Sequence, residues 1–129
     1  MVEKKQELTS RERALKCAAL ALDKKAYEVK IYEITRISSI ADYLVLASGT
    51  SDKQVQAIAE SVKQGLKPFG RHLDIEGLQE GNWVIIDYGD IIFHAFHEDM
   101  RRYYNLDDLW SAAPKIPVPA EYQWEGRQD

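Results

Sequence analysis

Apolar residues recur along this chain with two different periods, and each change of period marks the boundary of a predicted element. The segment Thr9-Ser-Arg-Glu12 fits a capping box, in which a Thr and a Glu side chain satisfy free amide groups at a helix start. We therefore predict a helix from Thr9 to about Lys25. Its apolar stripe consists of Leu15, Ala18, Ala19 and Leu22.

Two strands and a second helix follow. Residues Tyr27–Ile34 alternate between apolar and polar side chains, which is typical of a half-buried strand. Tyr43–Ala47 is a continuous apolar run, which indicates a central strand covered on both faces. The second helix is predicted to begin after Ser51 and to end before Pro68 and Gly70. Its buried stripe is expected to contain Val55, Ile58, Ala59, Val62 and Leu66.

A β-hairpin is predicted in the second half of the chain. Leu73–Glu76 indicates a short strand, and Trp83–Phe96 indicates two strands joined by a tight turn at Gly89-Asp90. A two-residue turn fixes the pairs Tyr88 with Ile91, Ile86 with Phe93, Val84 with Ala95, and Trp83 with Phe96. Glu98–Tyr104 and Leu106–Trp110 then indicate a short helix and a further helical turn.

The two faces of this hairpin differ in chemistry. One face carries only core-type side chains. The other consists of Trp83, Ile85, Asp87, Ile92, His94 and Phe96. Bulky aromatics with a few placed polar groups suit a partner-binding surface. For Trp83 and Phe96 the alternative is that a helix covers this face and buries them. For Tyr104 and Trp110 the alternative is that they only pack the last helix onto the sheet.

The order helix, strand, strand, helix, strand, strand, strand, helix predicts an α/β fold. The connection from Tyr43–Ala47 through the second helix to Leu73–Glu76 is expected to be a right-handed crossover between parallel strands. The fold class is then a single domain with a mixed five-stranded sheet and flanking helices. We expect residues 1–8 to be a flexible N-terminus, residues 9–113 to form the domain, and residues 114–129 to be a proline-containing tail, extended or disordered.

Composition and charge narrow the possible functions. The chain has 129 residues, 45% of them hydrophobic, and a net charge of −4. That balance argues against direct nucleic-acid binding as the main activity and permits binding to a basic protein. No apolar run approaches the length of a membrane span, and the charged start shows no signal peptide. A single Cys17 excludes an intramolecular disulfide, so a cytoplasmic location is expected.

Three candidate chemical sites have weak sequence support. The turn Ser48-Gly49-Thr50-Ser51 before a helix could bind phosphate, but a simple helix cap explains it as well. Asp74 and Glu76 lie on one face of a strand and, with Ser51, could hold Mg²⁺ and a nucleotide as in nucleotidyltransferases. His94 and His97 would point to opposite faces of a strand, which argues against a metal ion bound by both. We therefore expect no metal, no cofactor and no catalytic residues.

Several ordered segments together resemble the ribosomal silencing factor family, also called the Iojap family. They are Asp42–Ser51, Glu76-Gly77, Trp83–Asp90, His94-Ala-Phe96 and Arg101-x-x-Tyr104-x-Leu106-x-x-Leu109-Trp110. The resemblance covers roughly residues 14–113. Asp107 stands where the family often has Glu, and Leu44 where it often has Phe.

The resemblance implies a nucleotidyltransferase-like fold without catalysis. It also implies binding to large-subunit ribosomal protein L-fourteen, where the small subunit docks, so that subunit joining is blocked and translation falls in starved or stationary cells. A homodimer is expected for the free protein. The expected partner-binding residues are Glu76, Trp83, Asp87, His94, Phe96, Arg101, Tyr104 and Trp110. The competing hypothesis is a small nucleotide-binding or nucleotidyl-transferring enzyme that uses Ser51, Asp74 and Glu76.

Overall fold

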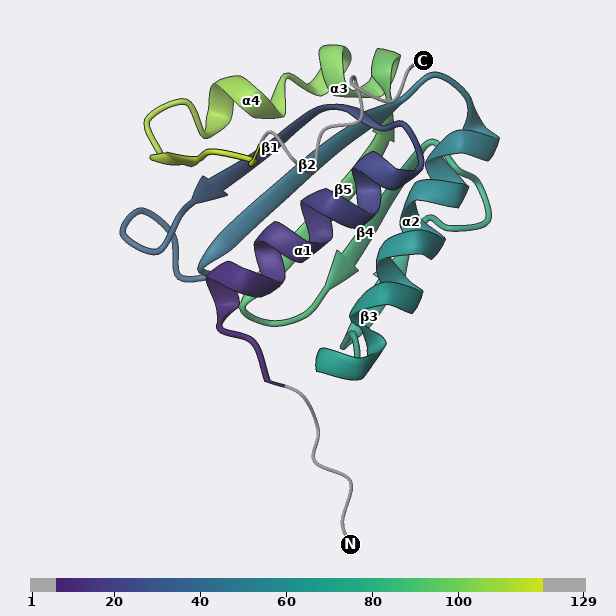
Figure 1. Ribbon diagram of the computed structural model, residues 1–129. Helices are drawn as coiled ribbons and strands as arrows, with labels where there is room; N and C mark the ends of the chain where they lie inside the picture. The colour runs from purple at the N-terminus through teal and green to yellow at the C-terminus, as the bar shows by residue number, and fades with distance from the viewer. Residues whose placement is uncertain (1–6, 120–129) are drawn as a thin grey trace, which may run out of the picture.

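A mixed six-stranded sheet forms the centre of the molecule. The structure is a computed structural model that describes residues 7–119, and its strand order is β3-β4-β5-β2-β1-β6 (Figure 1). The strands are β1 (Tyr27–Glu33), β2 (Tyr43–Gly49), β3 (Asp74–Glu76), β4 (Trp83–Asp87), β5 (Ile91–His97) and β6 (Lys115–Ile116). The helices are α1 (Ser10–Asp23), α2 (Asp52–Leu66), α3 (Glu98–Tyr104) and α4 (Leu106–Leu109), with a 3₁₀ turn at Lys67–Phe69.

The two long helices lie side by side and cover one face of the sheet (Figure 1). The predicted capping box is present at Thr9, and all five predicted stripe residues of α2 are fully buried. Their apolar faces meet the core-type face of the β4–β5 hairpin, including Val84, Ile86 and Phe93. This side of the sheet is therefore the main core, as the sequence predicted.

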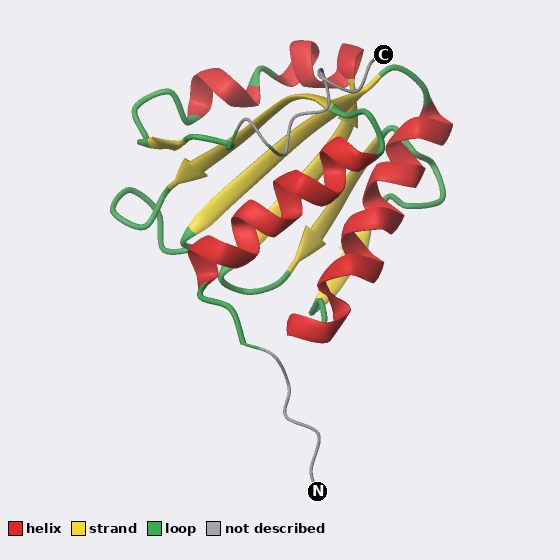
Figure 2. Ribbon diagram, viewed as in Figure 1, coloured by secondary structure: helices red, strands yellow, loops and turns green. Residues whose placement is uncertain are grey.

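The short helices α3 and α4 lie on the opposite face and cover only part of it. A second, smaller core forms under them around Tyr32, Leu46 and Phe96, with Met100 and Trp110 packed against it. Figure 2 shows the helices gathered into these two groups about the sheet. Because α3 contacts β5 and β2, the β3–β4 end of this face is left without a helix above it.

The predicted hairpin register is confirmed. Trp83 pairs with Phe96, Val84 with Ala95, and Ile86 with Phe93, and the Tyr88 amide donates to the Ile91 carbonyl at 2.9 Å. A two-residue turn leaves no freedom to slip, so the local prediction survives in the tertiary structure.

The predicted crossover joins two strands that do run parallel, but β2 and β3 are not neighbours, because the β4–β5 hairpin lies between them and β2 pairs with β5. The predicted number of five strands was wrong. The sheet has a sixth strand, because the Glu33 amide donates to the Pro114 carbonyl and brings Ile116 beside Ile31. The proline-containing segment thus contributes an edge strand. The structure does not describe the rest of the predicted tail, residues 120–129, or residues 1–6 of the predicted flexible N-terminus.

Strand β1 also departs from the half-buried pattern. Ile31 and Tyr32 are both 1% exposed, although they point to opposite faces. The register of β1 against β2 shifts between Tyr27 and Lys30, and Glu28 in that interval has φ +50°. The irregularity is a β-bulge, and α4 then supplies the cover that buries Tyr32.

Candidate functional site

The uncovered end of the second sheet face brings together four of the eight predicted partner residues. We call it the Trp83 surface and define it as Glu76, Trp83, Ile85, Asp87 and Tyr104. Glu76 pairs with Ile85 across β3 and β4, so the two side chains share this face with Trp83 and Asp87. Tyr104 reaches the same place from the end of α3 and is 50% exposed. Two strands and a helix end therefore build one mixed apolar and acidic surface.

Trp83 is the centre of an aromatic cluster. Its ring centroid lies 5.0 Å from that of Tyr104 and 5.4 Å from that of Phe96. Its Nε1 donates a hydrogen bond to Nδ1 of His94 at 2.9 Å. The side chain is half-buried, so the indole is held in place on its inner side while part of it stays accessible. Trp83 therefore packs against the domain while part of its ring stays accessible to solvent, and its contact with a partner stays a prediction.

His94 supports this cluster and is shielded from solvent. Burial lowers its pKa from 6.5 to about 4. The imidazole is therefore neutral near pH 7, which is the state in which Nδ1 can accept a hydrogen bond from Trp83. We interpret His94 as the group that orients the Trp83 indole.

Phe96 and Arg101 were expected to touch a partner, and the structure revises that expectation. Phe96 is fully buried beneath Trp83, and Arg101 is 4% exposed. The guanidinium of Arg101 is paired with Asp107 and lies over the Phe96 ring at 5.8 Å. Phe96 is closed off from solvent and Arg101 nearly so, and in this conformation both support the surface from below. The sequence missed this because it does not show that α3 folds back over β5.

Trp110 belongs mainly to the second core, where it packs while half-buried beside Leu106 and Ala113. Tyr103, which was not among the predicted partner-binding residues, is 79% exposed and stacks edge-on against Tyr104 at 4.9 Å. The signal that could have found it is its position beside Tyr104 on a helix of only seven residues. The exposed aromatic character of α3 therefore comes from the pair Tyr103–Tyr104.

Carboxylates line the β3 side of the Trp83 surface. Asp74 pairs directly with Asp87 across the two strands, and Glu76 follows on the same face. Like charges directly opposite each other in a sheet are unfavourable. One oxygen of Asp87 is occupied, because it accepts from the Gly89 amide at 2.8 Å. A positively charged partner would reduce the repulsion between these carboxylates.

The hypothetical nucleotide site is not assembled. Ser51 follows β2, whereas Asp74 and Glu76 lie on β3, and strands β4 and β5 separate them. Three strand spacings of about 4.8 Å each put these groups roughly 14 Å apart across the sheet. Ser51 caps α2 by accepting from the Gln54 amide at 3.1 Å. Within residues 7–119, no cluster of three or more His, Cys, Asp and Glu side chains could hold a metal ion.

The remaining candidate residues have structural roles. The Thr50 amide donates to the Gln54 side chain at 2.7 Å, so the turn before α2 is capped from within. His97 caps α3 by accepting from the Asp99 amide at 3.2 Å. Cys17 is fully buried, and burial raises the pKa of its thiol. None of the described helices is both long and apolar enough to cross a membrane.

The family model described as "Ribosomal silencing factor during starvation" matches residues 7–129. A ribosomal silencing factor from Bacillus subtilis is 45% identical over 102 residues, which are 78% of this chain and 86% of the relative. A chloroplastic Iojap protein from Arabidopsis thaliana is 27% identical over 115 residues, which are 88% of this chain and 48% of that protein.

Solved structures agree with the fold. A crystal structure of a Chromobacterium violaceum protein has a TM-score of 0.79 at 27% identity, and the match covers 88% of this chain and 93% of that one. A Bacillus halodurans crystal structure has a TM-score of 0.71 at 38% identity, covering 83% and 99%.

The fold and the Trp83 surface are those of a small α/β domain suited to partner binding. The family match spans nearly the whole chain and narrows this class to one family. The chain belongs to the ribosomal silencing factor (RsfS) family, whose members are non-catalytic ribosome-silencing factors.

Proposed function

We propose that this protein binds the large ribosomal subunit through its protein L-fourteen and thereby blocks association of the two subunits. The observation that carries the proposal is the family match over residues 7–129, together with 45% identity to a relative named for ribosomal silencing. We expect the protein to act in the cytoplasm, where it would meet such a partner. We expect the free protein to be a homodimer, as the family resemblance implies.

The Trp83 surface is the proposed docking site. Trp and Tyr are the residue types most enriched among energetically dominant contacts, and Trp83 and Tyr104 touch each other at its centre. The carboxylates of Glu76 and Asp87 lie around them, and the chain has a net charge of −4. A basic ribosomal protein is complementary to such a surface, and the charges should speed association more than they strengthen the final complex.

The proposed mechanism is occupation of space. The bound domain would cover the face of the large subunit at which the small subunit docks, so joining stops without any covalent step. Translation would then fall in proportion to the fraction of large subunits that carry the factor. Repression under nutrient limitation or in stationary phase is the physiological setting that we propose.

Co-sedimentation with isolated ribosomal subunits tests the proposal. The protein should pellet with large subunits in a saturable way and not with small subunits. Trp83→Ala, tested after its fold has been verified, should reduce the pelleted fraction. Equal binding to both subunits, or binding that Trp83→Ala and a charge reversal at Glu76 both leave unchanged, would contradict it.

A further inference from the structure

Within residues 7–119, Arg101 is the one charged residue that is buried, with 4% of its surface exposed. A buried charge is costly unless its hydrogen bonds are satisfied by well-placed partners. Replacing a buried ion pair by apolar residues is often neutral or stabilising, so such a pair is weak evidence for a role in stability alone. The position of Arg101, between the sheet and the helix that carries Tyr104, suggests a geometric role instead.

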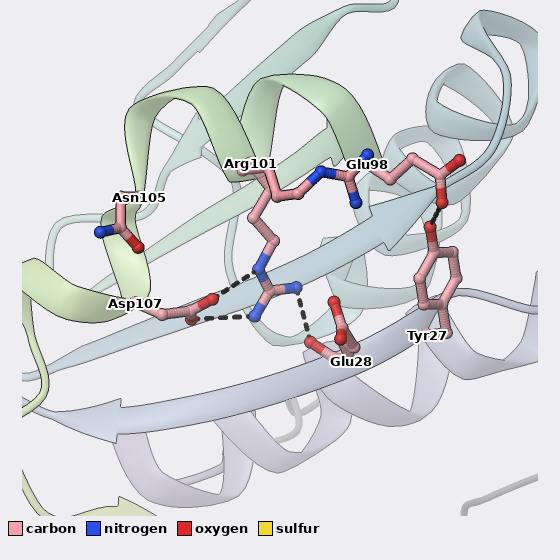
Figure 3. A pocket seen from close by; sticks show the side chains of 7 residues that line it. Tyr27, Glu28, Glu98, Arg101, Asn105 and Asp107 are labelled. Atoms are coloured by element: carbon pink, nitrogen blue, oxygen red, sulfur yellow. Dashed lines mark hydrogen bonds and ion pairs between the residues drawn. The ribbon is translucent and has the colours of Figure 1, made fainter.

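All three guanidinium nitrogens of Arg101 donate to protein oxygens (Figure 3). Nε and Nη2 bind the two carboxylate oxygens of Asp107, each at 2.9 Å. Nη1 donates to Ser48 Oγ at 2.8 Å and to the Glu28 carbonyl at 2.6 Å. Arg101 therefore links α3 to α4 and to two strands of the sheet.

Asp107 completes this network. Its Oδ1 also accepts from the Tyr32 hydroxyl at 3.1 Å. Burial alone would raise the pKa of Asp107, but the hydrogen bonds and charge of Arg101 outweigh that effect and hold the pKa below its usual value. The carboxylate is therefore ionised wherever the pair is intact, and the fork-to-fork geometry restricts its orientation.

The network encloses the residue that faces Trp83. Tyr104 lies between Arg101 and Asp107 in the sequence, and Asn105 reverses the chain with φ 52° and ψ 48°. The Asn105 amide donates to the Arg101 carbonyl at 2.9 Å. With both ends of this short segment fixed, the direction of Tyr104 is fixed as well, and its ring meets Trp83 at 5.0 Å.

A hollow of about 310 Å³ lies beside this network and is lined by side chains that include Glu28, Glu98 and Arg102 (Figure 3). It offers no consistent charge to a ligand, because it contains both signs and the Arg101 nitrogens are already bound to protein. The Tyr27 hydroxyl donates to Glu98 at its rim. The hollow is therefore a gap beside the ion pair and not the reason for it.

We propose that the Arg101–Asp107 pair, seated on Ser48 and the Glu28 carbonyl, is a positioning clamp that holds Tyr104 against Trp83. Arg101 and Asp107 are positioning residues that pre-form the Trp83 surface without touching the partner. Pre-organisation of this kind raises affinity by reducing the ordering that binding would otherwise require. This inference rests on the proposed function for its effect on binding, but its structural part can be tested in the free protein.

A double-mutant cycle on large-subunit binding tests the clamp. Asp107→Asn should weaken binding about 10-fold in the parent and less than about 2-fold in a Tyr104→Ala background, because its effect passes through Tyr104. A merely structural role would give the same loss in both backgrounds. The matched control is Asp108→Asn, which removes the neighbouring exposed carboxylate. It should leave the affinity for large subunits unchanged in the parent and in the Tyr104→Ala background. All variants are compared below their denaturation midpoints.

The same variants are also examined without ribosomes. The indole N–H resonance of Trp83, assigned by its loss in Trp83→Phe, should shift in Asp107→Asn and stay in place in Asp108→Asn. If the parent fails to bind large subunits, the proposed function is wrong, while this resonance still decides the clamp. Ser48→Ala removes only one acceptor, and it serves as the milder variant if Asp107→Asn does not fold. An unmoved resonance, or equal binding losses in both backgrounds, would overturn the inference.

Discussion

The Trp83 indole donates its hydrogen bond to Nδ1 of His94, at 2.9 Å, across neighbouring strands β4 and β5. The bond requires an unprotonated Nδ1, so the proton of the neutral ring sits on Nε2. The orientation of the most prominent aromatic on the proposed docking surface therefore depends on the protonation state of a shielded histidine. This dependence has consequences for pH.

Stability should fall between pH 6.5 and pH 4 because of His94. Its pKa in the folded protein is lowered from 6.5 to about 4, so the unfolded chain binds a proton in this window that the folded protein does not. The stabilising contribution is present above the unfolded pKa and is lost as pH falls. Between about pH 7 and pH 5 the free energy of unfolding should drop by about 2 kcal/mol from this group.

His94→Phe is the variant that isolates this effect, because it keeps an aromatic ring and removes the titrating group. Asp90 and Asp107 have pKa values lowered below 3.8, so their contributions are lost only at more acidic pH and do not enter this window. Chemical denaturation at the two pH values gives the comparison. If the parent and the variant lose the same free energy, His94 is not the responsible group.

Trp83→Ala should weaken both binding and folding. Affinity for large subunits should fall by about 2 kcal/mol, because a central aromatic is removed from the proposed contact. The free energy of unfolding should fall by about 1 to 2 kcal/mol, since the ring is only half-buried. Denaturation midpoints and sedimentation titrations measure the two losses separately.

A matched control for Trp83 is Ile40→Ala, which removes an exposed apolar side chain from the loop before β2, outside the Trp83 surface. It should leave affinity unchanged. A Trp83→Ala protein that is destabilised yet binds with full affinity would reduce Trp83 to a packing residue. The docking surface would then have to be sought around Tyr103 and Tyr104.

Gly77→Ala should be more damaging than Gly89→Ala. Both glycines have a positive φ, of 83° and 92°, so each substitution carries a similar backbone strain of about 1 to 2 kcal/mol. An added Cβ at Gly77 would lie 2.1 Å from the Trp83 carbonyl oxygen, whereas at Gly89 the nearest atom, of Leu73, is 3.4 Å away. Thermal denaturation should rank the variants in this order, and only Gly77→Ala should also perturb Trp83. Equal losses would show that the β3–β4 turn accommodates a side chain.

The carboxylates of β3 should not behave as metal ligands. Neither the parent nor a double variant with Asp74→Asn and Glu76→Gln should show a thermal shift with Mg²⁺ and nucleoside triphosphate, because Ser51 lies across the sheet from them. The double variant should instead bind large subunits with a slower association rate and a weaker dependence on salt. A nucleotidyl-transfer activity present in the parent and lost in the variant would restore the enzyme hypothesis.

The parts of the fold that follow from neighbouring residues could be predicted from the sequence. The cap at Thr9 and the hairpin around Gly89-Asp90 depend on interactions a few residues apart, and the structure contains both. The buried stripe of α2 could be predicted equally well, because helical periodicity shows which side chains share a face.

Features that depend on distant segments could not be predicted in this way. The pairing of β2 with β5 and the addition of β6 join segments far apart in the chain, and no periodicity specifies such neighbours. The burial of Arg101 and Phe96 depends on α3 folding back over the sheet. At the candidate site, the hairpin pattern correctly placed Trp83, Asp87 and His94 on one face but could not show which of them that helix would cover.

An order-of-addition experiment tests the central claim that the protein silences ribosomes by occupying the joining face of the large subunit. The protein is added to separated subunits before they are mixed, or to ribosomes that have been joined and stabilised, and subunit association and translation are followed. We predict that inhibition rises with the fraction of large subunits occupied in the first case and is absent in the second. Equal inhibition of preassembled, stabilised ribosomes would contradict the account.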